Sequence, residues 1–361
     1  MNNNKKRQIL VQILAAVFLL AAAGSAVAAG GTDIKIGYLP ATGHGKLFIA
    51  QERGFFAEEG LKAELIGFIN SADGIAAIRS GKVDVGGFGT VAPLLQISTG
   101  ADLRIIGGLM GEDTSIITTA EISPKVKTLA DLKGKKVATI RLATGDAVLR
   151  GGLHKSGLSW KDDLEIFELK SPGAVIEAVK NGQVDAGVVW GPFDVSALEQ
   201  GLQTVLVSAD IFPGHPCCRL TVVGDQYAPR LDTWRRFLRA ILKAERYAFG
   251  GGAGHEQQAV EDISKYAKLD KALIDKSYFH SHLDQSTDPN ASGVKDFWSI
   301  IIDAGFVQST EDASRFIETG AYKQALDSLL AEEPDDAYWK KLKQVFDQRD
   351  SGTYGGGRGK S

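Results

Sequence analysis

Two stretches of the chain, about a hundred residues apart, repeat the same pair of short motifs. Ala41-Thr42-Gly43-His44 follows the apolar run 34–39, and Ala143-Thr144-Gly145-Asp146 follows the similar run 136–140. A second motif comes after each of them, AIRSGKVDVG at 77–86 and AVKNGQVDAG at 178–187. The two offsets are 102 and 101 residues, so the spacing is nearly constant. Self-similarity at a long, fixed spacing predicts a duplicated structural unit.

The pattern around these motifs is typical of an α/β protein. From residue 32 to about residue 225, short apolar runs alternate with stretches of helical periodicity, and glycines close several of the helices. After residue 225 the strand pattern stops and helical periodicity continues to about residue 330. The sequence therefore predicts α/β layers around largely parallel sheets, with a helical C-terminal portion that must pack on one of them.

The N-terminus has the features of an export signal. Lys5, Lys6 and Arg7 precede an apolar run at 9–23, and Ala26-Val27-Ala28 forms a small-x-small cleavage site. The alternative is an uncleaved anchor, but the apolar run is shorter than the roughly 20 residues that span a bilayer. We expect residues 1–28 to be a cleaved signal peptide, the mature protein to be periplasmic, and 351–361 to form a disordered tail.

Charge and cysteine content exclude some classes of protein. The formal net charge is −3, and it becomes −6 once the three basic residues of 1–28 are removed. An acidic chain gives no electrostatic reason to expect nucleic acid as a partner. The two cysteines, Cys217 and Cys218, are adjacent, so they cannot form the disulfide framework of a small secreted domain.

Each Ala-Thr-Gly motif lies where a strand ends and a helix begins. Helix starts present unpaired N–H groups and the positive end of the helix dipole, which bind anionic or strongly polar groups. Two such starts facing each other across a cleft would clamp a ligand. The candidates are Thr42, Gly43 and His44 on one side and Thr144, Gly145 and Asp146 on the other. The alternative is that these side chains only cap their own helices or loops.

Other candidates lie at strand ends that should open into the same crevice. Trp190 ends a strand before Gly191-Pro192 and could stack on a ligand or belong to the core. Arg141 and Arg219 could supply a positive group, or face solvent. The remaining ligand-binding candidates are Pro40, Gly89, Thr90, Gly111 and Glu112.

The segment Gly214-His215-Pro216-Cys217-Cys218-Arg219 is the most unusual in the chain. Its cysteines could form a vicinal disulfide, remain as buried small side chains in the wall of an organic-ligand pocket, or present soft metal ligands. Thiolates with imidazole suit zinc or copper(I), so His44, His215, Cys217 and Cys218 form an alternative metal set. The spacing matches no standard zinc motif, and we expect no metal and no cofactor.

Three segments, 45–61 (GKLFIAQERGFFAEEGL), 128–137 and 182–193, resemble the periplasmic solute-binding proteins of ABC importers for sulfonates, taurine, nitrate and the thiamine pyrimidine precursor. The resemblance implies a two-lobed periplasmic binding protein fold of type II that closes on its ligand by a hinge motion. It implies that 33–120 and 220–350 form lobe 1 and that 121–219 form lobe 2. The chain would then cross between lobes near Thr119 and near Arg219.

The resemblance implies a monomeric, non-enzymatic protein that captures a small polar or anionic organic solute and delivers it to an ABC permease in the membrane. Two alternatives remain open. One is a periplasmic sensor or binder of a soft metal or thiol-reactive ligand at Cys217 and Cys218. The other is an enzyme similar to the pyrimidine synthases of this fold, which the export signal disfavours. The sequence does not identify the ligand, because loops decide it among proteins that share this scaffold.

Overall fold

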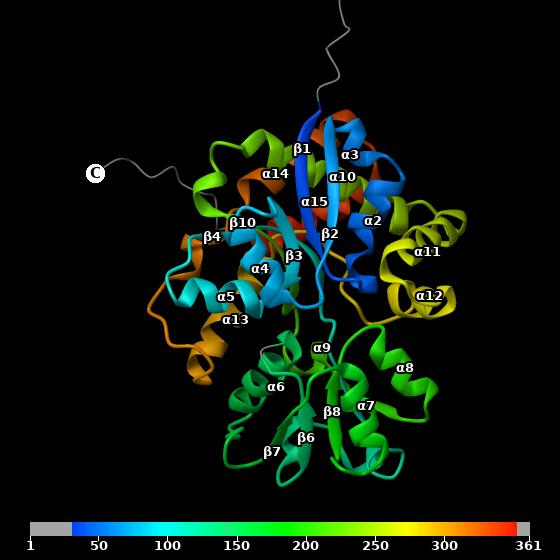
Figure 1. Cartoon of the computed structure of the whole chain (residues 1–361), viewed down its shortest axis with the longest axis vertical. Helices are drawn as coiled ribbons and strands as arrows, with labels where there is room; N and C mark the ends of the chain where they lie inside the picture. The colour runs from blue at the N-terminus through cyan, green and yellow to red at the C-terminus, as the bar shows by residue number, and fades with distance from the viewer. Residues whose placement is uncertain (1–30, 142, 352–361) are drawn as a thin grey trace, which may run out of the picture.

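The computed structural model describes residues 31–141 and 143–351. The predicted signal peptide, 1–28, and the predicted tail from residue 352 therefore lie outside the described residues. Figure 1 shows two lobes, one above the other, each built around its own sheet. In the described ranges, no helix is long and apolar enough to span a bilayer.

The two sheets have the same topology, as the repeated motifs predict. The first sheet has the order β2-β1-β3-β10-β4 and the second has the order β7-β6-β8-β5-β9. In each, three parallel strands are followed by one antiparallel strand from another part of the chain. The first sheet contains β1 Thr32–Tyr38, β2 Leu61–Gly67, β3 Val85–Gly89, β4 Leu103–Gly111 and β10 Pro216–Val223. The second contains β5 Ser115–Thr118, β6 Lys136–Thr139, β7 Glu165–Glu168, β8 Ala186–Val189 and β9 Gln203–Val207.

The repeated Val-Asp pair has the same structural role in both sheets. Asp84 Oδ2 accepts a hydrogen bond from the backbone N–H of Lys35 at 2.7 Å, and Asp185 Oδ2 accepts one from Lys136 N–H at 2.8 Å. Each aspartate lies directly before one strand, β3 or β8, and binds the backbone of the neighbouring parallel strand, β1 or β6. The contact fixes the register of the two strands. The duplication in sequence is therefore a duplication of the contacts that align the strands.

Helices cover both sheets. We call the first sheet with its helices lobe 1 and the second sheet with its helices lobe 2. In lobe 1 the N-terminal helices are α2 Gly45–Glu52, α3 Phe55–Glu58, α4 Ser71–Arg79 and α5 Val91–Ser98. In lobe 2 they are α6 Thr144–Lys155, α7 Pro172–Lys180, α8 Phe193–Glu199 and α9 Ser208–Ile211.

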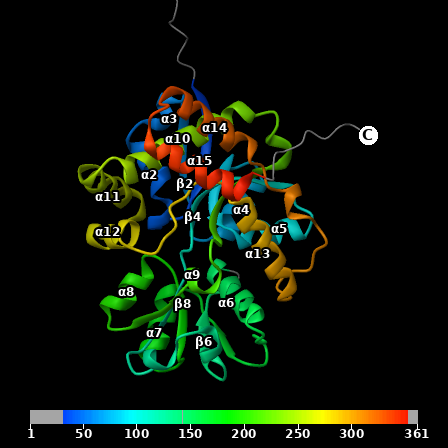
Figure 2. The same ribbon diagram turned by 180° about the vertical axis from the view of Figure 1, so that it is seen from behind.

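The predicted helical C-terminal portion packs on lobe 1, as Figure 2 shows from behind. Its first helix, α10 Leu231–Gly250, places Trp234, Phe237 and Ile241 three or four residues apart, and all three are fully buried in the core beneath β1 and α2. The others are α11 Ala253–Ala267, α12 Lys271–Phe279, α13 Ala291–Asp303, α14 Gly320–Glu332 and α15 Ala337–Asp350. Short 3-10 turns lie at Thr42–His44, Ser123–Lys125, Leu129–Leu132, Gly224–Gln226 and Ala313–Arg315.

The chain passes between the lobes at two places that differ from those expected. Strand β5 belongs to the second sheet and β10 to the first. We therefore propose lobe boundaries at 112–114 and 212–215, in place of crossings near Thr119 and Arg219. The reason is that β4 and β5 follow each other with only three residues between them, so the crossing comes before the apolar run at 115–118.

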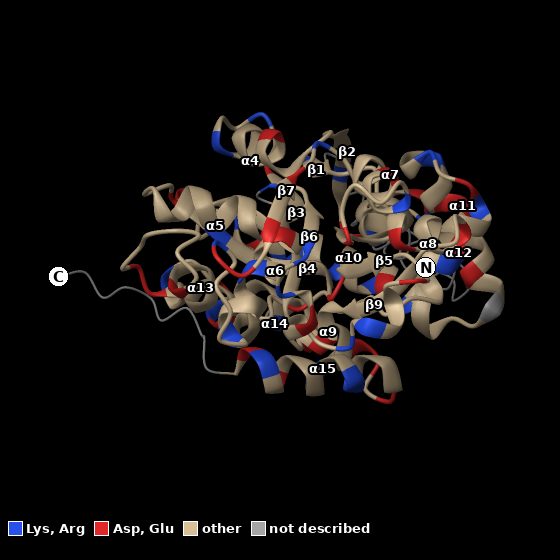
Figure 3. Ribbon diagram, turned by 90° about the horizontal axis from the view of Figure 1, so that it is seen from below, with Lys and Arg blue, Asp and Glu red and all other residues tan. Residues whose placement is uncertain are grey.

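The lobes are in contact in this structure. Trp160 Nε1, on lobe 2, donates a hydrogen bond to the carbonyl oxygen of Ala304 on lobe 1 at 3.0 Å, and Lys276 Nζ of α12 lies 2.6 Å from Glu199 Oε1 of α8. Gly151 of α6 lies against Ile300 of α13, where an added Cβ would be 2.3 Å from Ile300 Cγ2. Seen from below, acidic and basic residues are interspersed over the helices and not segregated by sign (Figure 3). We call this arrangement, with the two lobes in contact, the closed arrangement.

Candidate functional site

A cavity of about 100 Å³ lies between the two lobes. Lobe 1 supplies its walls from the ends of β1, β3, β4 and β10, and lobe 2 supplies them from the start of α6 and the end of β8. The lining residues are Leu39, Ala41, His44, Ser71, Gly89, Met110, Asp113, Thr114, Ala143, Thr144, Gly145, Trp190, Cys217 and Cys218. Seven of the sequence-predicted candidates are among them, namely His44, Gly89, Thr144, Gly145, Trp190, Cys217 and Cys218.

His44 is held as a neutral hydrogen-bond donor. Its Nδ1 accepts a hydrogen bond from the backbone N–H of Leu39 at 3.3 Å, so the neutral ring carries its proton on Nε2. Burial, followed by the positive charge of Lys46, lowers the pKa of His44 to about 3. Nε2 is buried and has no hydrogen-bond partner in the described residues. The ring therefore offers one unused N–H at the wall of the cavity.

The start of α6 forms the facing wall. Thr144 Oγ1 donates to the carbonyl oxygen of Cys217 at 3.4 Å, which links the lobes across the cavity. Asp146, in the first turn of α6, is fully buried, and its Oδ1 accepts from Arg150 Nε at 2.8 Å. Asp146 therefore pairs with Arg150 on the same helix and does not line the cavity.

The adjacent cysteines are free thiols that both line the cavity. Neighbouring strand residues normally face opposite sides of a sheet, but the pairing of β10 with β4 shifts register on both sides of Cys218. The Cys217 carbonyl is fixed by Thr90, whose N–H and Oγ1 both donate to it, at 2.8 and 2.7 Å. The hydrogen bond that the Cys217 thiol makes to Cys218, and then burial, raise the pKa of the Cys217 thiol well above its ordinary value. Both features favour the thiol of Cys217 over a reactive thiolate.

The alternative metal set is not assembled. Within the described ranges, no group of three or more His, Cys, Asp or Glu side chains is placed to hold a metal ion. His215 lies outside the cavity wall, fully buried between Phe212 and Phe297, with ring centroids 6.4 and 6.2 Å away. The aromatic pair encloses its ring, so His215 does not line the cavity, and its contact with a ligand stays a prediction.

Several other candidates lie beside the cavity and not in its wall. Pro40 is exposed, whereas Thr42 and Gly43 are buried in the 3-10 turn, where an added Cβ on Gly43 would be 2.0 Å from Met110 Sδ. Thr90 is fully buried beneath Cys217. Arg141 is exposed, with its Nε 3.8 Å from Glu168 Oε2, so it faces solvent and not the ligand.

Gly111 and Glu112 belong to the crossing between lobes. The Gly111 N–H donates to the carbonyl of Asp284 at 2.8 Å, and Glu112 Oε1 accepts a hydrogen bond from Gly214 N–H on the other crossing segment. Glu112 has a φ of 53°, which is unusual for a residue with a side chain. These two residues join the crossing segments to each other and to lobe 1, and they do not line the cavity.

Asp113 is the lining residue that the sequence motifs missed. Its side chain comes from the crossing segment after β4, and the residue is 5% exposed. Asp113 Oδ1 accepts a hydrogen bond at 2.9 Å from the backbone N–H of Gly191, the residue that follows Trp190. Burial raises the pKa of Asp113 well above its ordinary value, and the nearby Cys217 and Asp194 raise it further. Burial therefore disfavours the charged form of this carboxyl.

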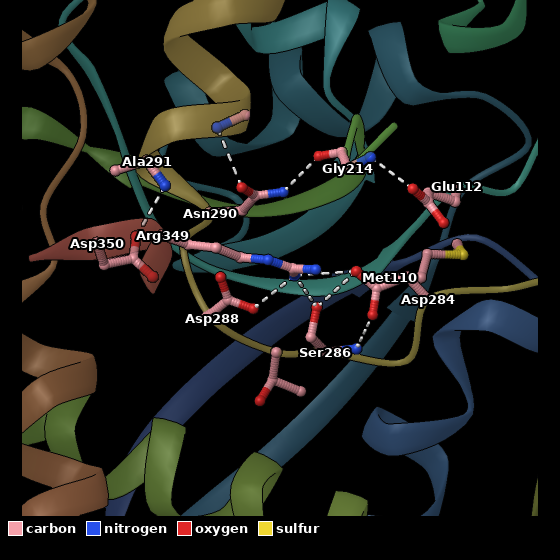
Figure 4. A network of polar contacts seen from close by, with 12 residues as sticks. Met110, Glu112, Gly214, Asp284, Ser286, Asp288, Asn290, Ala291, Arg349 and Asp350 are labelled. Carbon is pink, nitrogen blue, oxygen red and sulfur yellow. Dashed lines mark hydrogen bonds and ion pairs between the residues drawn. The ribbon is translucent and has the colours of Figure 1, made fainter. Parts of the chain in front are cut away.

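A network of polar contacts connects the two crossing segments to the C-terminal helices (Figure 4). Arg349 Nη1, from α15, donates to Asp284 Oδ2 at 2.9 Å and to Ser286 Oγ at 2.8 Å, and it lies 3.4 Å from Asp288 Oδ1. Asn290 Nδ2 donates to the carbonyl of Gly214 at 2.8 Å. The C-terminal helix thereby contacts the segment 284–290, which in turn holds the crossing at Gly214.

Asp350 predicts a specific pH dependence of stability. Burial, and then the charge of Asp288, raise the pKa of Asp350 from 3.8 to about 8. The folded state therefore keeps a proton that the unfolded chain releases, so this group stabilises the fold fully below pH 3.8, and that stabilisation is lost as the pH rises to about 8. Asp350→Asn, which cannot titrate, should flatten this decline while keeping an acceptor for the N–H of Ala291. Urea unfolding of both proteins at several pH values between about 4 and 8 measures the effect, and parallel curves would contradict it.

The comparisons with known proteins agree with this architecture. The periplasmic nitrate-binding protein of Synechocystis PCC 6803 superimposes with a TM-score of 0.71 at 18% identity, covering 85% of this chain and 92% of that one. The fold is therefore that of the two-lobed periplasmic binding proteins, as predicted. The chain belongs to the NMT1/THI5 like family, whose sequence model matches residues 41–251.

Relatives in this family include both binding proteins and enzymes. A protein of Brucella abortus (strain 2308) that is described only as a binding protein is 27% identical over 275 residues, covering 75% of this chain and 82% of its own length. The 4-amino-5-hydroxymethyl-2-methylpyrimidine phosphate synthase of Schizosaccharomyces pombe is 28% identical over 214 residues, covering 56% of this chain and 60% of its own. The more extensive match is to the binding protein.

Proposed function

We propose that the protein is an extracytoplasmic solute-binding protein, which captures a small solute between its lobes and delivers it to an ABC permease. The observation that carries this proposal is the cavity whose walls come from both lobes, with His44, Met110 and Cys218 on one side and Thr144 and Trp190 on the other. A ligand held by both lobes stabilises the closed arrangement and shifts the population toward it. The closed form would then be the one that the permease recognises.

The binding step needs no chemistry from the protein. The groups at the cavity wall are a neutral imidazole, two thiols with no activating base, and a carboxyl whose pKa is raised. These groups suit hydrogen bonding and packing, which is what reversible capture requires. We therefore propose that the solute leaves the site unchanged, and the N-terminal sequence supports a periplasmic location.

Native mass spectrometry of protein purified gently from the periplasm tests the proposal. We expect a non-covalent adduct of a small organic molecule that is lost on denaturation and is recovered chemically unchanged. Gly89→Leu should lose the adduct, because a side chain at Gly89 would enter the cavity, where its Cβ would be 3.0 Å from Thr144 Oγ1. Gly254→Leu is the matched control, since an added Cβ there meets nothing within 4 Å.

Two outcomes would count against the proposal. One is an adduct that persists in Gly89→Leu, because the solute would then bind outside the cavity. The other is an importer-dependent uptake phenotype that stays normal when the chromosomal gene carries Gly89→Leu and the protein is present at its usual level.

A further inference from the structure

Resting on the solute-binding function proposed above, we propose that the cavity takes a small organic cation, an ammonium or amidinium group on a compact apolar body, whose N–H pairs with the carboxylate of Asp113. The proposal replaces the expectation of an anionic solute. It follows from the charges at the cavity, the nature of its walls and one unused hydrogen-bond donor.

The charged groups nearest the cavity are carboxylates. In the described part of the chain, no lysine or arginine lines it, whereas Asp113 does. A second carboxylate lies directly behind, since a Cβ built on Gly191 would be 3.0 Å from Asp113 Oδ1 and 3.9 Å from Asp194 Oδ1. Asp194 is buried and accepts from Ser115 Oγ at 3.2 Å. Where either of these carboxyl groups is ionised, an oxyanion placed here would meet a negative charge at low dielectric, which is strongly unfavourable.

The buried cations near the cavity already have hydrogen-bond partners. The Arg219 guanidinium donates to the carbonyls of Met110 and Asp288; burial lowers the pKa of Arg219, and the carboxylates of Asp288 and Asp284 oppose that shift. Lys46 Nζ donates to the carbonyl of Leu109 at 2.8 Å and to Gln285 Oε1 at 2.7 Å. Neither is available to a ligand anion without breaking contacts that hold lobe 1 together.

The positive potential at the start of α6 is also partly offset by a nearby carboxylate. The positive end of the helix dipole faces the cavity at Thr144 and Gly145, but the carboxylate of Asp146 lies in the same turn. Because this carboxylate offsets part of the positive potential at the helix start, the free N–H groups suit a neutral acceptor, such as a hydroxyl or carbonyl oxygen, better than a full anion. The unused Nε2–H of His44, which is buried and without a partner, suits the same kind of acceptor.

The remaining walls fit the body of such a cation. Leu39, Met110 and the two thiols are apolar and polarizable, and the Trp190 ring provides a π face beside Asp113. The volume, about 100 Å³, is below the roughly 150 Å³ of a cavity known to hold benzene. The solute should therefore have only a few heavy atoms besides its charged group.

Binding of a cation should release a proton. Asp113 faces Cys217 on β10, Asp194 on α8 and the neutral His44 across the cavity, with Arg219 behind Cys217, and burial favours its protonated form. When the ammonium ion enters, the carboxyl gives its proton to solvent and the ion pair forms. The affinity should then rise with pH until Asp113 is ionised in the empty protein.

Isothermal titration calorimetry with size-matched probes tests this inference. The probes are propylammonium, propionamide, propionate, propane-1-sulfonate and nitrate, each in two buffers of different ionisation enthalpy near pH 7. We expect propylammonium to bind most tightly, with release of protons to the buffer. Asp113→Asn should weaken propylammonium binding at least tenfold and abolish proton release. Glu121→Gln, which removes an equal charge from an exposed position, should change neither.

Several results would overturn the cation assignment. They are tighter binding of either anion or of propionamide, failure of propylammonium to bind at tens of millimolar, or unchanged affinity in Asp113→Asn. If Asp113→Asn does not fold, the proton release that accompanies propylammonium binding to the unmodified protein tests the role of Asp113 instead. A neutral or anionic adduct in native mass spectrometry would overturn the cation assignment and leave the solute-binding function standing. Normal uptake in the Gly89→Leu strain would overturn that function itself.

Discussion

Gly151→Leu should weaken solute binding about 5- to 150-fold, because overpacking at a close contact typically costs about 1–3 kcal/mol. Gly151 lies on α6 of lobe 2 and faces Ile300 on α13 of lobe 1, where even a Cβ would be 2.3 Å from Ile300 Cγ2. The added side chain obstructs only the closed arrangement, since opening the lobes separates the two helices. Calorimetry with the solute recovered from the native protein measures the effect, and small-angle X-ray scattering should show a larger radius of gyration.

Gly173→Leu is the matched control for this prediction. Gly173 lies on α7 in the same lobe, and an added Cβ there meets nothing within 4 Å. Its affinity and scattering curve should match those of the unmodified protein. Equal affinities in Gly151→Leu and Gly173→Leu would show that α6 and α13 do not close on each other when solute binds.

Arg219→Met should lower the free energy of unfolding by about 3–5 kcal/mol, which is typical when one partner of a buried charge network is removed. Arg219 is fully buried, and its guanidinium donates to the carbonyls of Asp288 and Met110. Methionine fills much of the space, but it leaves both carbonyls without these donors and removes one of the two guanidinium groups near the Asp288 carboxylate, the other being that of Arg349. The loss should appear as a lower urea midpoint with an unchanged m-value.

Arg141→Met provides the comparison. Arg141 has a side chain that is 70% exposed, and its contact with Glu168 is 3.8 Å long. Exposed ion pairs of this kind contribute little, so the change in stability should stay within about 0.5 kcal/mol. A similarly small change in Arg219→Met would mean that the Arg219 network relaxes or admits water and is not required for stability.

The fold could be predicted from the sequence because the repeated motifs carry the contacts that define it. Asp84 and Asp185 bind the backbone of β1 and β6 in the same way, and Asn70 and Ser171 cap α4 and α7 through N–H groups three residues on. The helix caps span three residues and the aspartate contacts span 49 residues in both halves, so the same spacing recurs in the sequence. These contacts place β3 beside β1 and β8 beside β6.

The candidate site was only partly predictable because the two Ala-Thr-Gly motifs are not equivalent in space. In the second, Thr144 and Gly145 begin α6 directly and line the cavity. In the first, the residues 42–44 form a 3-10 turn before α2, and Gly43 packs under the Met110 side chain. The chain neighbours Ala41 and His44 therefore reach the cavity in place of Thr42 and Gly43.

Asp113 and Met110 could not be predicted, since no local motif surrounds them. Both lie near the end of β4, where the chain leaves one sheet for the other, and they face the cavity only because β10 returns beside β4 from a hundred residues later. A polar residue directly after an apolar strand, at a crossing between lobes, is the one signal that could have pointed to Asp113. Long-range pairing of this kind is not visible in sequence spacing.

The hydrogen bond from Trp160 to Ala304 gives the protein an intrinsic optical reporter. The indole N–H is bonded across the lobes, and the Arg150 guanidinium lies 4.3 Å from the centre of the ring. Separation of the lobes would transfer the indole N–H from a backbone carbonyl to water, and tryptophan emission responds to such a change in polarity. Stopped-flow fluorescence of the unlabelled protein could therefore follow opening and closing in real time, with Trp160→Phe identifying the part of the signal that comes from this contact.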